Sequence, residues 1–308
     1  QVCIFTDRMI VQDVINKNVL FSPLNWGMGH VSRSISILKQ LQDQQNNVFV
    51  ACNADSRLIY EEYLTGITFI DHADYPFLFS GDGNFERDIK QSFWKLKQRL
   101  KNERKEVETY VQKYNIDLVL SDHRYGFISS VKPSIFITHQ LNLPITGYKK
   151  IANFYHKILI NKFRSVWVLD YSDSRLAGKL SWSSGRKNTF YIGPYSRFSL
   201  SKNMIEQNEN KIIIASGPDV YAQQLVDDIA RLNSVVFDVV CSENINLPKS
   251  MIKIVGGWKM KDQAIMNAKH IISRSGYSTI MDLEILNRKA TLIPTPGQAE
   301  QEYLSTLR

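Results

Sequence analysis

Short apolar runs alternate with longer amphipathic stretches along nearly the whole of this 308-residue chain. Runs such as 18–23 and 47–52 are rich in β-branched and aromatic residues and predict strands. The stretch between them carries apolar residues three or four positions apart and predicts a helix over 30–44. Because such strands are apolar on both faces and alternate with helices, we expect parallel sheets covered by helices.

The alternation defines two series of elements. The predicted strands are 18–23, 47–52, 67–71, 116–121, 134–138, 165–169, 211–215, 235–241, 252–255, 270–273 and 290–294. The predicted helices are 30–44, 56–64, 86–113, 220–232, 262–268 and 277–286. A polar stretch without periodicity, 196–210, separates the series and is typical of a linker. We therefore predict an α/β protein with two Rossmann-like, doubly wound domains, 18–193 and 194–308, whose strand ends face a common cleft.

The composition indicates a globular protein without a membrane-spanning helix and favours an anionic partner. Apolar residues make up 44% and charged residues 22%, and no run reaches the ~18–20 apolar residues of a membrane-spanning helix. Charges interrupt 1–18, so no signal peptide is expected there. Three widely spaced cysteines argue against a disulfide framework or a cysteine zinc site and favour the cytoplasm. A net charge of +8 favours an anionic partner: nucleic acid, a nucleotide or an acidic membrane.

A glycine-containing loop links the first predicted strand to its helix. Gly27 and Gly29 would let the backbone approach a ligand and would leave helix N–H groups free for an anion. The third glycine of a dinucleotide fingerprint is replaced by Ser32, so a plain tight turn is an equal alternative. Asn25 and Arg33 flank the loop and are predicted to line the cleft.

His30 and Asp122 are the candidate acid–base pair. His30 opens the helix after the glycine loop, and Asp122 ends the strand 116–121, so both belong to one rim of the sheet. A neutral histidine there could accept a hydroxyl proton, with the aspartate orienting it. A helix cap or surface residue is the alternative for His30, and an N-cap or turn residue for Asp122. His123 and Glu86 are reserve candidates for the base.

The segment 271–282 is the strongest candidate for binding a ligand. A buried strand ends in Arg274, Ser275 and Gly276, and a helix begins at once with Ser278 and Thr279 in its first turn. These amides, hydroxyls and the guanidinium could converge on a diphosphate. Asp282, further along the helix, could accept both hydroxyls of a ribose. Ordinary capping of a strand–helix junction is the alternative.

A second polar cluster follows the last predicted strand. Gln298, Glu300 and Gln301 open the next helix after a proline- and glycine-shaped loop. Amides and carboxylates of this kind suit the hydroxyl groups of a sugar. Taken alone, the segment would be an ordinary acidic helix start.

Together these motifs resemble the donor-binding half of GT-B glycosyltransferases, particularly family 28. That family includes the peptidoglycan transferase that makes lipid II and is related to plant-type UDP-sugar transferases. The resemblance covers about 18–304, and the loop ending in His30 matches the family's GxGH motif. Asp282 is shorter than the usual glutamate, and Arg274 stands where plant-type relatives have histidine. Family members continue past the glutamine motif, so we expect the C-terminal domain to be incomplete.

The resemblance implies a reaction and a set of site residues. The reaction would be inverting, metal-independent transfer from a nucleotide sugar, by family habit UDP-linked, with His30 as base and no other cofactor. No pair of aspartates has the spacing and loop position of a metal-binding DxD motif. Besides the residues above, the donor site would include the base-cradling loop with Trp258 and Met260, and the pair Ser216 and Gly217.

The segment 90–105 bears on the acceptor and on where the protein works. It carries seven basic residues with Phe93, Trp94 and Leu96 among them. One interpretation is peripheral contact with anionic lipid at the inner face of the cell membrane, which would suit a lipid-linked acceptor. The other is a solvated helix face with its aromatic residues in the core and a saccharide or other soluble acceptor.

Two other functions stay open at this point. One is a nucleotide-sugar epimerase of the same fold, whose cleft would need more carboxylates than we can place. The other, resting on charge alone, is a nucleic-acid binder, which would need basic and exposed aromatic residues along a groove. We do not expect nucleic acid to be the partner.

Overall fold

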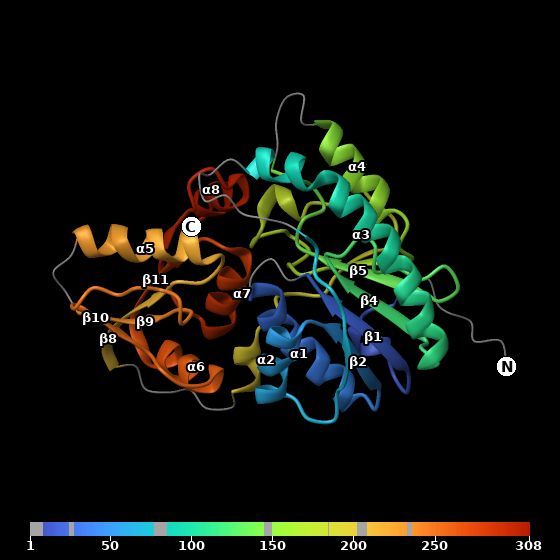
Figure 1. Ribbon diagram of the computed structural model, residues 1–308, viewed down its shortest axis with the longest axis horizontal. Helices are drawn as coiled ribbons and strands as arrows, with labels where there is room; N and C mark the ends of the chain where they lie inside the picture. The colour runs from blue at the N-terminus through green and yellow to red at the C-terminus, as the bar shows by residue number, and fades with distance from the viewer. Residues whose placement is uncertain are drawn as a thin grey trace.

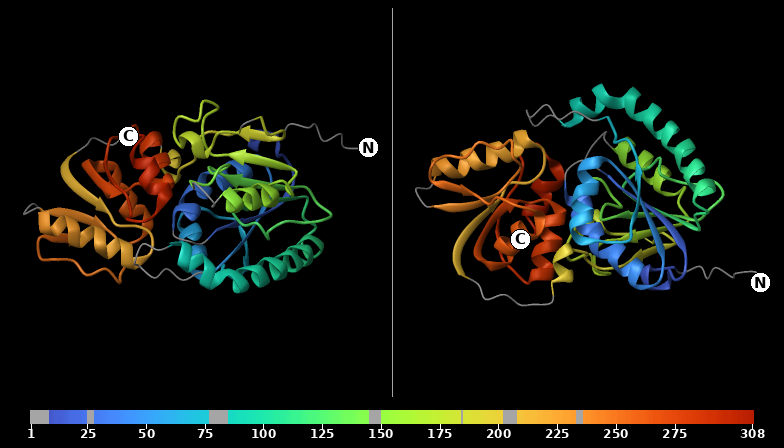
Figure 2. Two further views of the ribbon diagram at one scale, coloured as in Figure 1. Left: turned by 90° about the horizontal axis from the view of Figure 1, so that it is seen from above. Right: turned by 60° about the horizontal axis from the view of Figure 1, so that its bottom comes forward.

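The computed structural model describes residues 9–24, 28–76, 85–144, 150–183, 185–201, 208–232 and 236–308. Within them the chain forms one seven-stranded and one five-stranded sheet, each parallel and covered by helices (Figure 1). The predicted α/β class with two doubly wound sheets is confirmed. The strands of the first sheet lie within 18–191 and those of the second within 208–293, and the two sheets lie side by side (Figure 2).

Both sheets reverse their strand order at the first strand. The larger sheet has the order β3-β2-β1-β4-β5-β6-β7 and the smaller β10-β9-β8-β11-β12. Their strands are β1 (Asn18–Pro23), β2 (Asn47–Cys52), β3 (Thr68–Asp71), β4 (Leu118–Asp122), β5 (Ser134–Thr138), β6 (Ser165–Val168), β7 (Thr189–Tyr191), β8 (Asn208–Ile214), β9 (Phe237–Val240), β10 (Met251–Lys253), β11 (Ala268–Arg274) and β12 (Thr291–Ile293). A ligand is expected where the order reverses, between β1 and β4 and between β8 and β11.

The helices follow their strands as expected for such sheets. They are α1 (Gly29–Asp43), α2 (Ala54–Tyr63), α3 (Phe85–Lys113), α4 (Lys150–Ile160), α5 (Asp219–Leu232), α6 (Trp258–Asn267), α7 (Tyr277–Leu286) and α8 (Ala299–Ser305). The strands β1, β2 and β5 and helix α7 begin and end at the predicted residues. Helix α4 and strand β7 were not predicted: β7 is only three residues long, and α4, although apolar residues recur along it at helical spacing, was overlooked.

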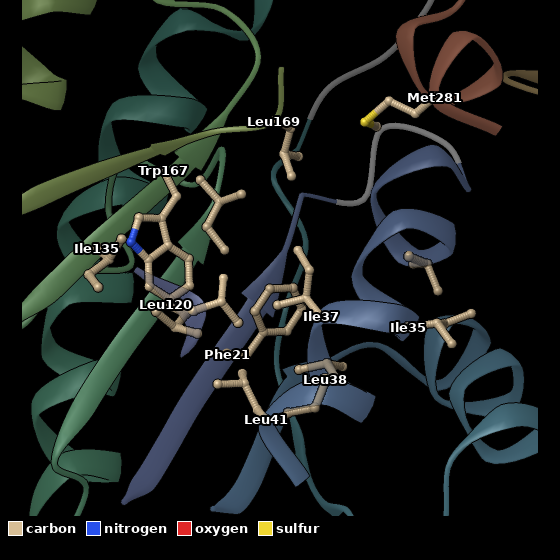
Figure 3. Close-up of a cluster of buried hydrophobic side chains, with 14 of the residues drawn as sticks. Phe21, Ile35, Ile37, Leu38, Leu41, Leu120, Ile135, Trp167, Leu169 and Met281 are labelled. Carbon is tan, nitrogen blue, oxygen red and sulfur yellow. The ribbon is translucent and has the colours of Figure 1, made fainter. Parts of the chain in front are cut away.

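Alternate strand residues of the larger sheet face two different layers. Phe21, Leu120 and Trp167 point to the layer that holds α1 (Figure 3). Their neighbours Leu20 and Val119 point the other way and pack with Val107 and Val111 of α3. The period of two in a strand produces this division, and it explains why these strands are apolar throughout.

The C-terminal helices complete the core of the larger sheet. Tyr277, Ile280 and Met281 of α7 and Leu304 of α8 belong to the same buried cluster as the α1 side of that sheet (Figure 3). Helix α7 also has buried partners in the smaller sheet through Leu283. Because α7 contacts both cores, it is fixed relative to α1, and the N-termini of these two helices can hold a defined geometry.

Helix α3 combines a buried C-terminal half with an exposed aromatic pair. Phe93 and Trp94 are 52% and 74% exposed, so of the two interpretations of 90–105 the one that placed its aromatic residues in the core is wrong for this pair. Arg99 is buried and bonds to Glu106, which removes it from the exposed basic face. Within the described residues, no helix is both long enough and apolar enough to cross a bilayer.

Candidate functional site

Two adjacent cavities lie between the sheets, at the carboxyl ends of their first strands. The larger holds about 460 Å³ and the smaller about 180 Å³, and both are lined by Gly29, Gly217 and Ser278. The register pairs Pro23, before the glycine loop, with Asp122 at the end of β4. The cavities therefore occupy the position where doubly wound sheets bind ligands.

Four helix N-termini line the smaller cavity in the described part of the chain. Three are the start of α1 at Gly29, the loop Ser216–Gly217 before α5, and the start of α7 at Gly276; the fourth is the start of α8, which contributes the side chains of Gln298 and Glu300. A side chain at position 29 would collide with the Ser278 hydroxyl, so glycine is needed for α1 and α7 to approach this closely. Gly217 has a φ of +95°, a left-handed conformation that favours glycine. Free N–H groups and partial positive charge thus converge on one small space.

His30 faces this space with Asp122 and Arg33 behind it. Its Nδ1 lies 3.1 Å from Oδ2 of Asp122 and 2.8 Å from a terminal guanidinium nitrogen of Arg33. Its side chain is 18% exposed, whereas those of Arg33 and Asp122 are almost fully buried. Burial and the Arg33 charge lower the pKa of His30, with Asp122 acting in the opposite direction. The imidazole is therefore neutral near pH 7, and in the tautomer that places its one proton on Nδ1, toward Asp122, the lone pair of Nε2 can accept a proton.

Glu300 joins the two halves of the site. Its carboxylate accepts hydrogen bonds from Nε2 of His139, at 2.8 Å, and from the side-chain amide of Gln140, at 2.5 Å. The His139 ring stacks on Tyr277, with the ring centroids 4.0 Å apart. These contacts hold the end of β5 against α7 and α8. His139 and Gln140 were missed by the sequence analysis, although they follow a buried strand directly, as Asp122 does.

Asp282 lies at the larger cavity within a buried ion network. Its carboxylate accepts hydrogen bonds from the Ser196 hydroxyl, at 2.5 Å, and from Arg197, at 3.2 Å. Arg197 also binds Asp262 through Nε, at 2.7 Å, and contacts the Ser32 hydroxyl. Asp282 retains 18% exposure, so part of its carboxylate remains open to the cavity. Arg197 falls within the stretch interpreted as a linker, and nothing in the sequence singles it out.

The structure brings most of the predicted site residues to the two cavities. The smaller is lined by Gly29, His30, Arg33, Ser216, Gly217, Arg274, Gly276, Ser278, Thr279, Gln298, Glu300 and Gln301. The larger is lined by Gly29, Ser216, Gly217, Trp258, Ser278, Thr279 and Asp282. Asn25 and Gly27 lie outside the described residues, as does the side chain of Glu86.

Several predicted donor-binding side chains have partners within the protein instead. The Ser275 hydroxyl is fully buried, lines neither cavity and donates to the Gln301 carbonyl oxygen. Met260 is 59% exposed and lines neither cavity. Arg274 lines the smaller cavity, but its terminal nitrogens donate to the carbonyl oxygens of Pro294 and Tyr221. The Ser275 hydroxyl and the two terminal nitrogens of Arg274 are therefore bonded within the protein, whereas the buried Nε of Arg274 has no partner among the described residues.

Comparison of the sequence with protein-family models and with curated proteins gives no match. Solved structures with the same fold are found nonetheless. Arabidopsis thaliana UGT89C1, complexed with UDP-L-rhamnose, aligns with a TM-score of 0.61 at 10% identity, over 95% of this chain and 82% of its own. The spinosyn rhamnosyltransferase SpnG, complexed with thymidine diphosphate, gives 0.54 at 12% identity, over 93% and 83%. Acinetobacter baumannii MurG gives 0.50 at 16% identity, over 94% and 83%. The predicted GT-B fold is thereby confirmed.

Proposed function

We propose that this protein transfers a sugar from a nucleoside diphosphate sugar to an acceptor hydroxyl. The observation that carries the proposal is the convergence of the α1, α5 and α7 N-termini beside the His30–Asp122 pair. Each N-terminus contributes about half a positive charge, and together they suit a diphosphate. The shared GT-B fold supports the same function.

The two cavities suggest how the donor lies. The diphosphate and sugar would occupy the smaller cavity, where Glu300 and Gln298 offer polar groups to sugar hydroxyls. The nucleoside would occupy the larger cavity, between Trp258 and the open part of the Asp282 carboxylate. We propose a UDP-linked donor, with a TDP-linked donor as the first alternative, because structures of the same fold bind UDP-L-rhamnose and thymidine diphosphate.

The proposed reaction is a single displacement. His30 takes the proton of the acceptor hydroxyl while the hydroxyl oxygen forms a bond to the anomeric carbon. The bond from that carbon to the diphosphate oxygen breaks, and its electron pair leaves with the diphosphate. Attack opposite to the leaving group inverts the anomeric configuration. We propose that the helix N–H groups stabilise the departing charge without a metal, and that the donor is the only small molecule required besides the acceptor.

Nucleotide binding gives the most direct test of the donor site. UDP, TDP and GDP would be compared by thermal unfolding, and one of them is expected to stabilise the protein by about 2.7 kcal/mol at 100 times its dissociation constant. Asp282→Ala should remove most of this stabilisation, measured against the unliganded variant. Glu284→Ala is the matched control, because Glu284 lies on the same helix but pairs with Arg175 at the surface.

The alternatives give different results in the same experiments. Failure of every nucleotide to stabilise the protein, together with tight salt-dependent binding of RNA or DNA, would support nucleic-acid binding instead. Epimerisation of a nucleotide sugar without any acceptor would support an epimerase. Release of diphosphate that depends on an acceptor hydroxyl is the outcome expected of a transferase.

We also propose that the acceptor is reached at an anionic membrane surface. The exposed pair Phe93 and Trp94 on α3 and the exposed pair Phe154 and Tyr155 on α4 belong to helices on the same face of the larger sheet. On α3 the aromatic pair is accompanied by exposed basic residues: Lys95, Lys97, Lys101 and Lys105. Aromatic groups at the headgroup level and lysines beside anionic lipid suit peripheral binding.

Vesicle binding tests this surface. The protein is expected to sediment with vesicles that contain phosphatidylserine, and less so at high salt or with phosphatidylcholine alone. Trp94→Ala should weaken binding several-fold because a large exposed ring no longer enters the interface. Trp182→Ala is the control, since Trp182 is also exposed, at 64%, but lies outside both helices. Equal losses in the two variants would contradict the assignment.

A further inference from the structure

Arg33 and Asp122 form a buried ion pair behind the candidate base. Nε of Arg33 lies 3.0 Å from Oδ2 of Asp122, and a terminal nitrogen of the same guanidinium bonds Oδ1, so the pair is bidentate. Arg33 is one turn into α1 and Asp122 ends β4, and neither exceeds 2% exposure. Both groups are therefore fixed by the sheet and by the first helix packed on it, rather than by a loop.

The same guanidinium lies against the imidazole. A terminal nitrogen of Arg33 is 2.8 Å from Nδ1 of His30, while Oδ2 of Asp122 is 3.1 Å from that atom. A buried carboxylate needs a positive charge or several hydrogen-bond donors beside it to remain an anion, and the groups bonded to the carboxylate of Asp122 are Arg33 and His30. Without Arg33, His30 would be the nearest group able to supply that charge, and it would do so by binding a proton from solvent. A histidine protonated in this way has no lone pair left to accept the proton of an acceptor hydroxyl.

We propose that Arg33 is a positioning residue of the reaction: it supplies the buried positive charge that balances Asp122, and so keeps His30 unprotonated until an acceptor hydroxyl arrives. Its role differs from that of the acid–base pair itself, because Arg33 acts through Asp122 and His30 rather than on the sugar. The inference rests on the proposed function for its role in turnover, whereas its effect on His30 can be measured without any substrate.

The remaining titratable groups around His30 agree with this assignment. Its ring lies 6.0 Å, centroid to centroid, from that of His123, whose pKa burial lowers strongly, so His123 is neutral. Beyond Arg33, Nδ1 of His139 lies 3.4 Å from the guanidinium, and Nε2 of His139 is hydrogen-bonded to Glu300. The Glu300 charge is thus held on the far side of His139. The charged groups closest to His30 remain Arg33 and Asp122.

The pKa shifts of Asp122 and His30 agree with this role of Arg33. Burial alone would raise the pKa of Asp122, but Arg33 and then His30 hold it well below its usual range. For His30, burial followed by Arg33 lowers the pKa, and Asp122 opposes them. Removing the Arg33 charge leaves Asp122 as the dominant neighbour, so the pKa of His30 should rise. Since the deprotonated form is the active one, activity should then be lost at a higher pH as the solution is acidified.

The test titrates His30 by NMR in the intact chain with labelled histidine, His30→Ala serving to assign the signal. Arg33→Gln is expected to raise the pKa of His30, and Arg33→Lys, which keeps the charge, to leave it close to wild type. Asp122→Asn should move it in the opposite direction. In turnover assays near pH 6.5, Arg33→Gln should lose about tenfold in kcat/KM relative to Arg33→Lys and recover as the pH rises.

The outcomes distinguish a failure of the proposed role of Arg33 from a failure of the proposed sugar transfer. A folded Arg33→Gln variant whose His30 titrates as in wild type would overturn the role of Arg33, whatever the protein's activity. Should that variant not fold, an unchanged His30 titration in Asp122→Asn would overturn it equally, because the ion pair would then have no influence on the imidazole. The proposed function fails separately, if the wild-type protein transfers no sugar while the NMR shifts occur as expected.

Discussion

Replacing His30 by alanine is expected to lower kcat by about 10²–10⁴-fold while nucleotide binding is retained. The ring is one of the residues that line the smaller cavity, whereas in the proposed complex the diphosphate would be bound by the backbone N–H groups at the starts of α1 and α7. The variant therefore loses the proton acceptor and keeps the dipoles that hold the donor. Steady-state kinetics would measure the first effect, and calorimetry with the preferred nucleotide the second.

His270→Ala is the matched control for that experiment. His270 lies on the surface at β11 of the smaller sheet, away from both cavities, and its replacement should leave turnover unchanged. Turnover of His30→Ala at the wild-type rate would show that another group takes the proton. His139, which lines the same cavity, would then be the first residue to test.

The fold could be predicted from the sequence because the apolar runs, the helical periodicity between them and the alternation of the two all indicated the same parallel α/β arrangement. The strands β1, β4 and β5 are buried on both faces, so their apolar runs are unbroken and their predicted bounds lie within about two residues of the observed ones. The carboxyl ends of parallel strands meet at one edge, which placed His30 and Asp122 together although they are 92 positions apart in the chain. To place these two residues together it was enough to know the order of strands and helices and where each strand ends.

What the sequence could not predict depends on contacts between distant side chains. Ser275 belongs to a segment whose sequence predicts phosphate binding, yet its hydroxyl donates a hydrogen bond to the Gln301 carbonyl oxygen. Arg197 stands in a polar segment without periodicity, yet it lies at the centre of the ion network between the sheets. Neither fact is encoded in local spacing, because each partner is contributed by an element that meets the residue only in the folded chain.

Arg197→Met is expected to destabilise the protein by about 3–5 kcal/mol, the usual cost of removing one partner from a buried ion network. The guanidinium is the shared counter-charge of Asp262 and Asp282, and its other contact, to Ser32, connects the network to α1. Methionine preserves the apolar volume of the stem, so the loss would come chiefly from the two carboxylates left behind. Urea unfolding monitored by fluorescence would measure it.

Arg175→Met provides the comparison that isolates burial. Arg175 pairs with Glu284 on α7, but the Arg175 side chain is 54% exposed and that of Glu284 29%, and such solvent-accessible pairs contribute about 0–1 kcal/mol. Equal destabilisation by the two substitutions would show that the Arg197 network is no stronger than a surface pair.

The pH dependence of the stability lost in Arg197→Met shows whether the loss comes from an unpaired buried carboxylate or from lost packing. Burial raises the pKa of Asp282 above its ordinary value even with Arg197 present, and removal of that charge should raise it further. A carboxyl group whose pKa is higher in the folded than in the unfolded protein stabilises the fold fully when the pH is below the unfolded-state pKa. This stabilisation is lost as the pH rises through the folded-state pKa, because the buried carboxyl then ionises. The deficit of the variant should therefore shrink as the pH falls from 7 towards the carboxyl range. A deficit that stays constant over that interval would mean that packing, and not charge, is what Arg197 contributes between the two sheets.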